Sequence, residues 1–246
     1  MTEEPYRWLE AIGNRREYVQ EQIKGGSPVL GASLPEGLLV LGVGVGHSKV
    51  FELFDRHLLA GLGHPADLEK IRQAAIDAAH VEAFTRAPED VSLRRLVGFG
   101  LSVQLKSNFE QLFTAPFLVE LLFAELGAEP GRDLFIRLHY DGAFELQAGG
   151  VAVCASTPEA EAGARTWLTG VVAGQTDRAS VADGLLQAWW RLGENKPFDD
   201  TLPSEAARRA GWRAALNGRV VEAAWLARER AEPVRFLPLT LAELGL

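Results

Sequence analysis

The segment 25–62 constrains the fold most, because it reads as four short strands joined by tight turns. Apolar runs of strand length cover Val29–Leu34 and Leu38–Val45, and Pro35-Glu36-Gly37 lies between them. Proline fixes φ and glycine tolerates positive φ, so this tripeptide predicts a hairpin. A second predicted pair, Val50–Phe54 and His57–Leu62, follows directly. Consecutive hairpins of this kind are typical of a sheet in a sandwich.

Helical periodicity occurs on both sides of these strands. Apolar residues before them recur at spacings of four or seven and predict an amphipathic helix over 1–24, which Gly25-Gly26 ends. After them, His64-Pro65-Ala66-Asp67 is typical of a helix start, and we expect a helix to about Phe84. A second helix is expected over about 93–113.

The remaining chain repeats this order. Asp141-Gly142 is a strong hairpin signal, and Ser180 with Asp183 can start a helix that runs through Trp190. The other expected elements are strands at 117–126, 133–139, 143–147, 151–155, 219–227 and 234–236, and helices at 157–172 and 204–216.

Strands joined by hairpins and separated by pairs of helices predict antiparallel sheets rather than a parallel one. We therefore expect an α+β fold, a four-layer αββα sandwich of two antiparallel sheets flanked by helix pairs. With 246 residues the chain fits a single domain, 1–246, in which 1–24 is the N-terminal helix and 195–218 a variable connection.

Composition excludes several classes of function. The net charge is −8 and no basic run is present, which argues against binding nucleic acid. Cys154 is the only cysteine, so an intrachain disulfide and a cysteine-rich zinc site are excluded, and a reducing cytoplasm fits. No apolar stretch reaches the roughly 18 residues that span a bilayer, so we expect a soluble protein without membrane contact. Nothing in the sequence indicates a cofactor.

Local sequence adds a family resemblance. Ser48–Arg56, Ala60–His64 and the helix at Leu68–Arg72 are similar to bacterial proteasome α-type subunits, which belong to the N-terminal nucleophile hydrolases. The ending, Arg219–Leu226 followed by Arg235-Phe236 and Leu239–Leu244, resembles their last strands and terminal helix. The resemblance covers roughly 15–246, although the connection at 196–217 is longer than usual.

The resemblance implies a function that is mechanical rather than chemical. An α-type subunit forms the wall of a ring, with seven copies implied, and controls entry to an interior chamber for protein degradation. The implied partners are further copies of the chain, a catalytic β-type subunit, an ATPase or other cap, and unfolded protein substrates. An orphan ring without a proteolytic role is a further alternative.

Ser27 carries the main rival hypothesis, a self-processing serine or threonine-type endopeptidase. Catalytic members of the family use an N-terminal hydroxyl residue whose free α-amine accepts the proton. Removal of residues 1–26 would expose Ser27 in that position. Pro28 stiffens the neighbouring backbone, and Val43 stands where the resemblance implies an acid in catalytic subunits. We therefore expect a structural Ser27.

Lys49 has two meanings within the family. In catalytic subunits the resemblance implies a lysine that lowers the proton affinity of the nucleophile, so Lys49 would assist Ser27. In α-type subunits it implies a lysine that lines a pocket for activator tails, where its ammonium would pair with a terminal carboxylate. A solvated lysine without a partner is the third possibility.

Other candidate sites are weaker. The glycines of 42–46 lack the spacing of a phosphate-binding loop. His64, Asp77 and His80 lack a further ligand at metal-binding spacing, so no metal site is expected. The tryptophans at 189, 190 and 212 are typical of core or subunit contacts, and Cys154 is expected to be inert.

Overall fold

The computed structural model describes residues 4–198, 205–229 and 234–246. The strands in this part of the chain are β1 Val29–Leu34, β2 Gly37–Gly44, β3 Val50–Phe54, β4 His57–Gly63, β5 Val119–Glu125, β6 Leu134–His139, β7 Phe144–Gln147, β8 Val151–Cys154, β9 Val220–Ala227 and β10 Phe236–Leu239. The α-helices are α1 Glu4–Ile23, α2 Pro65–Thr85, α3 Leu93–Arg95, α4 Ser102–Glu110, α5 Pro158–Val172, α6 Arg178–Gly193 and α7 Glu205–Leu216. A π-helical segment, η2 Leu96–Leu101, joins α3 to α4, and short 3-10 turns lie at η1 Pro88–Asp90 and η3 Pro130–Arg132.

The strands form two five-stranded sheets, and every recorded pairing is antiparallel. The first sheet has the order β10-β9-β2-β1-β8, and the second has the order β3-β4-β5-β6-β7. The predicted hairpin at Pro35-Glu36-Gly37 is confirmed, because Leu34 pairs with Gly37 across the turn. The predicted turn at Asp141-Gly142 is also present, with Gly142 at φ 85°.

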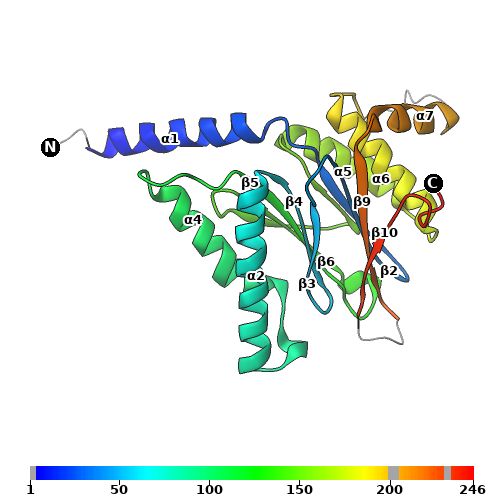
Figure 1. The fold of residues 1–246 in the computed structure, drawn as a ribbon, viewed down its shortest axis with the longest axis horizontal. Coiled ribbons are helices and arrows are strands. Elements are labelled where there is room, and N and C mark those ends of the chain that lie inside the picture. The colour runs from blue at the N-terminus through cyan, green and yellow to red at the C-terminus, as the bar shows by residue number, and fades with distance from the viewer. Residues whose placement is uncertain (1–3, 199–204, 230–233) are drawn as a thin grey trace.

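Hydrophobic packing divides the molecule into four layers (Figure 1). On β2, Leu39 and Leu41 face α5 and α6, whereas Leu38 and Val40 face the second sheet. The second sheet is covered on its other side by α2 and the α3–η2–α4 helix. Because both faces of each sheet are buried, the strands read as continuous apolar runs rather than alternating ones. The predicted αββα sandwich is confirmed.

Several predicted boundaries are wrong. The helix predicted to reach residue 113 ends at Glu110 and is interrupted by the π-helical turn. The last strand is β10 rather than 234–236, and residues 241–245 form turns instead of a terminal helix. The paired register begins at Phe236, opposite Leu226, and the side chain of Arg235 donates to the carbonyls of Ala227 and Arg228.

The start of α6 also differs from the prediction. Asp177 is its N-cap and accepts hydrogen bonds from the backbone N–H and the hydroxyl of Ser180, each at 2.9 Å. Ser180 is therefore a first-turn residue. Asp183, the other predicted start signal, lies within the helix and is buried.

Candidate functional site

The first candidate site lies where α1 meets β1. Val19 and Ile23 of α1 are buried between the sheets and the helix, and the Gly26 N–H donates to the Ile23 carbonyl at 2.8 Å. A Cβ on Gly26 would lie 2.7 Å from a methyl carbon of Leu62, so only glycine fits this junction. Ser27 follows it as a half-buried residue whose nitrogen is an ordinary amide. The sequence therefore holds α1 directly over the start of β1.

The structure brings Ser27 and Lys49 together. The Lys49 Nζ donates to the Ser27 carbonyl oxygen at 2.8 Å, and the Ser27 Oγ accepts from Trp189 Nε1 at 2.8 Å. The backbone N–H of Lys49 donates to the Glu222 carboxylate at 2.7 Å, which fixes the start of β3 against β9. The Lys49 stem passes over Gly44, where an added Cβ would come within 3.3 Å of it.

Burial changes the acid–base behaviour of this lysine. Loss of hydration lowers the pKa of Lys49, and the nearby guanidinium of Arg219 acts in the same direction. The Glu222 carboxylate offsets part of this effect. Burial also raises the pKa of the Cys154 thiol, which is fully enclosed. The lysine is therefore a partly desolvated cation that favours contact with a negative group.

The contacts of Ser27 bear on its chemistry. Among the described residues, no carboxylate or imidazole forms a hydrogen bond with its hydroxyl, which instead accepts from an indole. Lys49 contacts the carbonyl of Ser27 and not the hydroxyl. Val43 is buried in the apolar layer between the first sheet and the helices. As folded here, Ser27 lacks the adjacent base that a nucleophilic hydroxyl requires.

A small cleft opens beside Ser27. Its volume is about 270 Å³, and its walls come from the end of α1, the start of β1, the start of α5, the end of α6 and the segment after α7. Lys24 and Arg219 are its charged lining residues, and no carboxylate lines it in the described part of the chain. The cleft is therefore electropositive and suits an anionic group.

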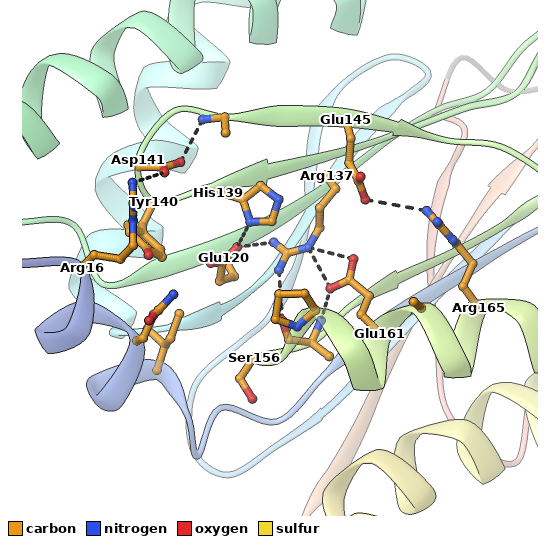
Figure 2. Close-up of a pocket in the computed structure, with 16 residues that line it drawn as sticks. Arg16, Glu120, Arg137, His139, Tyr140, Asp141, Glu145, Ser156, Glu161 and Arg165 are labelled. Atoms are coloured by element: carbon orange, nitrogen blue, oxygen red, sulfur yellow. Dashed lines mark hydrogen bonds and ion pairs between the residues drawn. The ribbon is translucent and has the colours of Figure 1, made fainter. Parts of the chain in front are cut away.

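A second cluster was not predicted from the sequence. Arg137 on β6 lies between two buried carboxylates, with Nη1 2.5 Å from Glu120 Oε2 and Nε 3.2 Å from Glu161 Oε2 (Figure 2). Desolvation alone would lower the pKa of Arg137, but the charges of Glu120 and Glu161 outweigh it and raise the pKa. Glu161 also accepts from Gln147 at 2.8 Å and from the Ala155 N–H at 3.0 Å. This cluster joins the first turn of α5 to β5, β6, β7 and β8.

The cluster forms the floor of a cleft of about 400 Å³. His139 Nδ1 lies 3.0 Å from Glu120 Oε2, and Figure 2 shows His139 and Arg137 both next to Glu120. Arg16 of α1 lies 3.6 Å from Asp141, and Arg165 of α5 lies 3.6 Å from Glu145. Charges of both signs therefore line this cleft and largely pair with each other. The paired charges beneath α1 therefore hold α5 and the strands together and have a structural role.

The weaker candidates fall into structural roles. His64 caps α2 by accepting from the Ala66 N–H at 3.3 Å, and His80 packs edge-on against Phe54. A search of the described residues found no group of three or more metal-binding side chains. Trp189 and Trp212 are buried, as predicted, and Trp190 is partly buried. None of the described helices has the length and apolar character needed to cross a membrane.

Comparison with known proteins relates the chain to one group. No protein-family model matches it. It is 29% identical to "Proteasome subunit alpha" of Streptomyces griseus over 146 residues, which are 58% of this chain and 54% of that protein. It is 32% identical to the protein of that name from Actinosynnema mirum over 133 residues, 53% of this chain and 50% of that protein. The match to "Proteasome subunit alpha" of Paenarthrobacter aurescens is 28% identical over 203 residues and 80% of each chain.

The chain thus spans about half the length of the first two of these relatives. The similarity recurs across proteins of one name, and its longest alignment takes in most of both chains. Two five-stranded antiparallel sheets between helical layers agree with it. The chain is similar to bacterial proteasome alpha subunits, over as much as 80% of its length.

Proposed function

We propose that the chain is a non-catalytic, α-type wall subunit of a bacterial proteasome-like ring that works in the cytoplasm by gating and docking. One observation supports this proposal above all. The Ser27 nitrogen is in a peptide bond with Gly26, helix α1 is packed over the start of β1, and the Ser27 hydroxyl accepts a hydrogen bond from Trp189. A residue in this state has no free amine to act as a base.

Helix α1 also supplies a surface for assembly. Its second half is anchored to the body through Val19 and Ile23, while its first half extends beyond the body (Figure 1). On that first half, Trp8 is 46% exposed and Leu9 is 66% exposed. We propose that this apolar surface packs on a neighbouring copy in a heterologous contact that closes a ring, with seven copies implied by the resemblance.

A second apolar surface lies on the outer helical layer of the second sheet. Phe84 at the end of α2 is 93% exposed, and Phe99 of η2 is 83% exposed. Val103 of α4 is exposed four residues after Phe99. We propose that this layer contacts a catalytic β-type ring, which would degrade unfolded proteins admitted through the α-type ring.

Lys49 is the proposed docking residue for a cap. Its ammonium is partly desolvated, and the adjoining cleft is electropositive. A terminal carboxylate of an ATPase or other cap would accept a charge-assisted hydrogen bond from Nζ. The ammonium has three donors, so the bond to the Ser27 carbonyl leaves two for a partner.

The assembly proposal is tested by native mass spectrometry at micromolar concentration. We expect a closed oligomer, and we expect Trp8→Glu to release monomers because it places a charge in the contact between copies. Val81→Glu is the matched control, since Val81 is exposed on α2, away from the proposed ring contact. A wild-type monomer, or a Trp8→Glu protein that still forms the oligomer, would refute the ring.

The alternative is a self-processing peptidase, and the contact between Lys49 and Ser27 favours it over other enzyme classes. This enzyme would require cleavage after Gly26 and would lose peptide hydrolysis in Ser27→Ala. Intact-mass measurement of the chain purified from cells separates the two functions. A chain that begins at Ser27 and hydrolyses peptides would overturn the non-catalytic proposal.

A further inference from the structure

Helix α7 lies outside the two pairs of helices that flank the sheets (Figure 1). It lies on the outer face of α6, within the connection that the sequence marks as long (Figure 1). Trp212 is fully buried and its Nε1 donates to Asp183 Oδ1 at 3.0 Å, while Arg209 Nε donates to the same oxygen at 3.2 Å. A Cβ on Gly211 would lie 2.5 Å from the Trp190 ring, so α7 approaches α6 closely. The helix is therefore held in one position.

The outer face of α7 and the residues after it are basic. Residues 205–219 carry four arginines and one glutamate, a formal charge of +3 in a chain whose net charge is −8. The exposed positions include three alanines spaced four apart, at 206, 210 and 214. Arg213 and Arg219 are also exposed, and their guanidinium carbons lie 5.3 Å from the Trp212 ring and 5.9 Å from the Trp189 ring. Neither guanidinium forms an ion pair with any carboxylate of the described residues.

This basic surface continues into the cleft beside Ser27. Arg219 follows the end of α7, where its N–H donates to the Leu216 carbonyl at 2.7 Å, and its side chain lines the cleft together with Lys24. Arg219 also lies close enough to Lys49 to lower the pKa of that lysine. Arg219 therefore links the cleft, which Lys24 also lines, to Lys49 behind it, and Arg213 lies six residues earlier on α7.

We propose that the cleft and the outer face of α7 form one docking surface for the acidic carboxy-terminal segment of a partner protein. The terminal carboxylate would enter the cleft beside Ser27 and draw the Lys49 ammonium toward it, and this part rests on the proposed docking function. The new part is that aspartate or glutamate side chains a few residues earlier contact Arg219 and Arg213. The exposed alanines let the segment lie close to α7, and guanidinium groups bind carboxylates through two parallel hydrogen bonds.

A peptide fits this surface better than a nucleic acid. Single-stranded nucleic acids gain much of their affinity from bases stacked on exposed aromatic rings. The rings of Trp189 and Trp212 are 2% and 0% exposed, so neither offers a face to a base. The cleft has a volume of about 270 Å³, so it accommodates one small group such as a carboxylate and not a row of nucleotides.

Fluorescence anisotropy with three labelled peptides tests the surface. The first peptide has a free carboxyl end and glutamates at about the third to sixth positions before it, a stretch that spans roughly the width of a helix. The second is the same peptide with an amidated end, and the third has glutamine in place of each glutamate. For the wild-type protein we expect the first peptide to bind most tightly. Each change should weaken binding roughly fivefold or more, as loss of charge-assisted contacts does.

The double variant Arg213→Gln/Arg219→Gln should bind the glutamate and glutamine peptides equally, while keeping its preference for the free carboxyl end. Arg132→Gln is the matched control, since Arg132 is an exposed arginine near the opposite end of the sheets. It should behave as wild type. Circular dichroism and thermal unfolding verify that the variants fold.

Several outcomes would overturn the proposal. These are equal binding of the glutamate and glutamine peptides to wild type, an undiminished glutamate preference in the double variant, the absence of saturable binding, or tighter binding of an RNA oligonucleotide of equal charge. A different result would be that the wild-type protein binds the free and the amidated peptides equally but still prefers glutamate to glutamine. That result would refute docking of the terminal carboxylate at Lys49. The contact with α7 would then stand.

Discussion

At the scale of single residues, the buried pairing of Arg137 with Glu120 and Glu161 removes three charged groups from water at a large cost in free energy. All three side chains are almost completely removed from water. Charges in such a position are tolerated only when each has a partner, because the cost of desolvation is several kcal/mol per ion. The geometry supplies those partners from two strands and a helix.

Replacement of Arg137 by an uncharged residue should therefore destabilise the fold strongly. Arg137→Met leaves two carboxylates buried without a counter-ion, and we expect it to lower the free energy of unfolding by about 3–5 kcal/mol. Urea denaturation monitored by tryptophan fluorescence measures this change. Arg132→Met, at an exposed arginine, is the control and should change stability by less than about 0.5 kcal/mol. A small effect of Arg137→Met would show that the pairing does not stabilise the fold.

Glu125 predicts a dependence of stability on pH. It accepts from the Leu93 N–H at 2.8 Å and lies 3.5 Å from His57 and 3.4 Å from Arg56. Desolvation alone would raise the pKa of Glu125, but these contacts outweigh it and lower the pKa. A carboxyl with a lowered folded pKa stabilises the protein above its unfolded value of about 4.3, and the contribution is lost as pH falls through the folded pKa.

We expect Glu125→Gln to lower the free energy of unfolding at pH 7 by about 1–3 kcal/mol. The difference from wild type should shrink as the pH falls below about 4, because the wild-type carboxyl then protonates. Thermal unfolding at a series of pH values measures both. Glu129→Gln, at an exposed glutamate, is the control, and a difference that stays constant with pH would contradict the argument.

At the scale of elements, the docking of α7 depends on a close approach that only glycine permits. An added Cβ at Gly211 would lie 2.5 Å from the Trp190 ring, whereas one at Gly170 in α5 meets nothing within 4 Å. Gly211→Ala should cost about 1–3 kcal/mol through overpacking. Gly170→Ala should be neutral or stabilise by up to about 1 kcal/mol, because alanine is the better helix former. Equal effects in chemical denaturation would mean that α7 is not held against α6.

The sequence predicted elements where the signal is local. Turn residues such as Pro35-Glu36-Gly37 and Asp141-Gly142 dictate backbone geometry by themselves, so the hairpins were found. Glu120, Arg137 and Glu161 were missed because their pairing depends on three elements that meet only in the folded chain. Glu120, a carboxylate within the otherwise apolar start of β5, was the one residue whose position could have indicated a buried ion pair. The π-helical turn of η2 has no comparable signature, although its two glycines agree with an irregular helix.

The site at Ser27 and Lys49 was predicted only in part. The family resemblance indicated both residues, and the structure places them in contact, but no pattern in the sequence predicted the hydrogen bond from Trp189 to Ser27. That bond joins residues 162 positions apart. Contacts over such separations follow from the whole fold and not from local pattern.

At the scale of the whole molecule, exposed aromatic residues fit the proposed assembly of several copies. Trp8, Phe84 and Phe99 lie on surfaces that a monomer would leave in water. If copies associate through the surface that contains Trp8, the association stabilises the fold by mass action. The midpoint of thermal unfolding should therefore rise by several degrees between about 1 and 100 μM protein. Trp8→Glu should abolish the rise while Val81→Glu keeps it, and a midpoint independent of concentration in wild type would contradict association.

The hydrogen bond from the Lys49 ammonium to the Ser27 carbonyl links two events that would otherwise be separate. The same cation holds the joint between α1 and β1, and its acceptor residue, Ser27, lines the electropositive cleft. An anion that draws this cation outward weakens one tether of the joint from which α1 projects. The binding of an anion in the cleft and the orientation of the projecting helix therefore depend on the same side chain, Lys49. A change in one would alter the other.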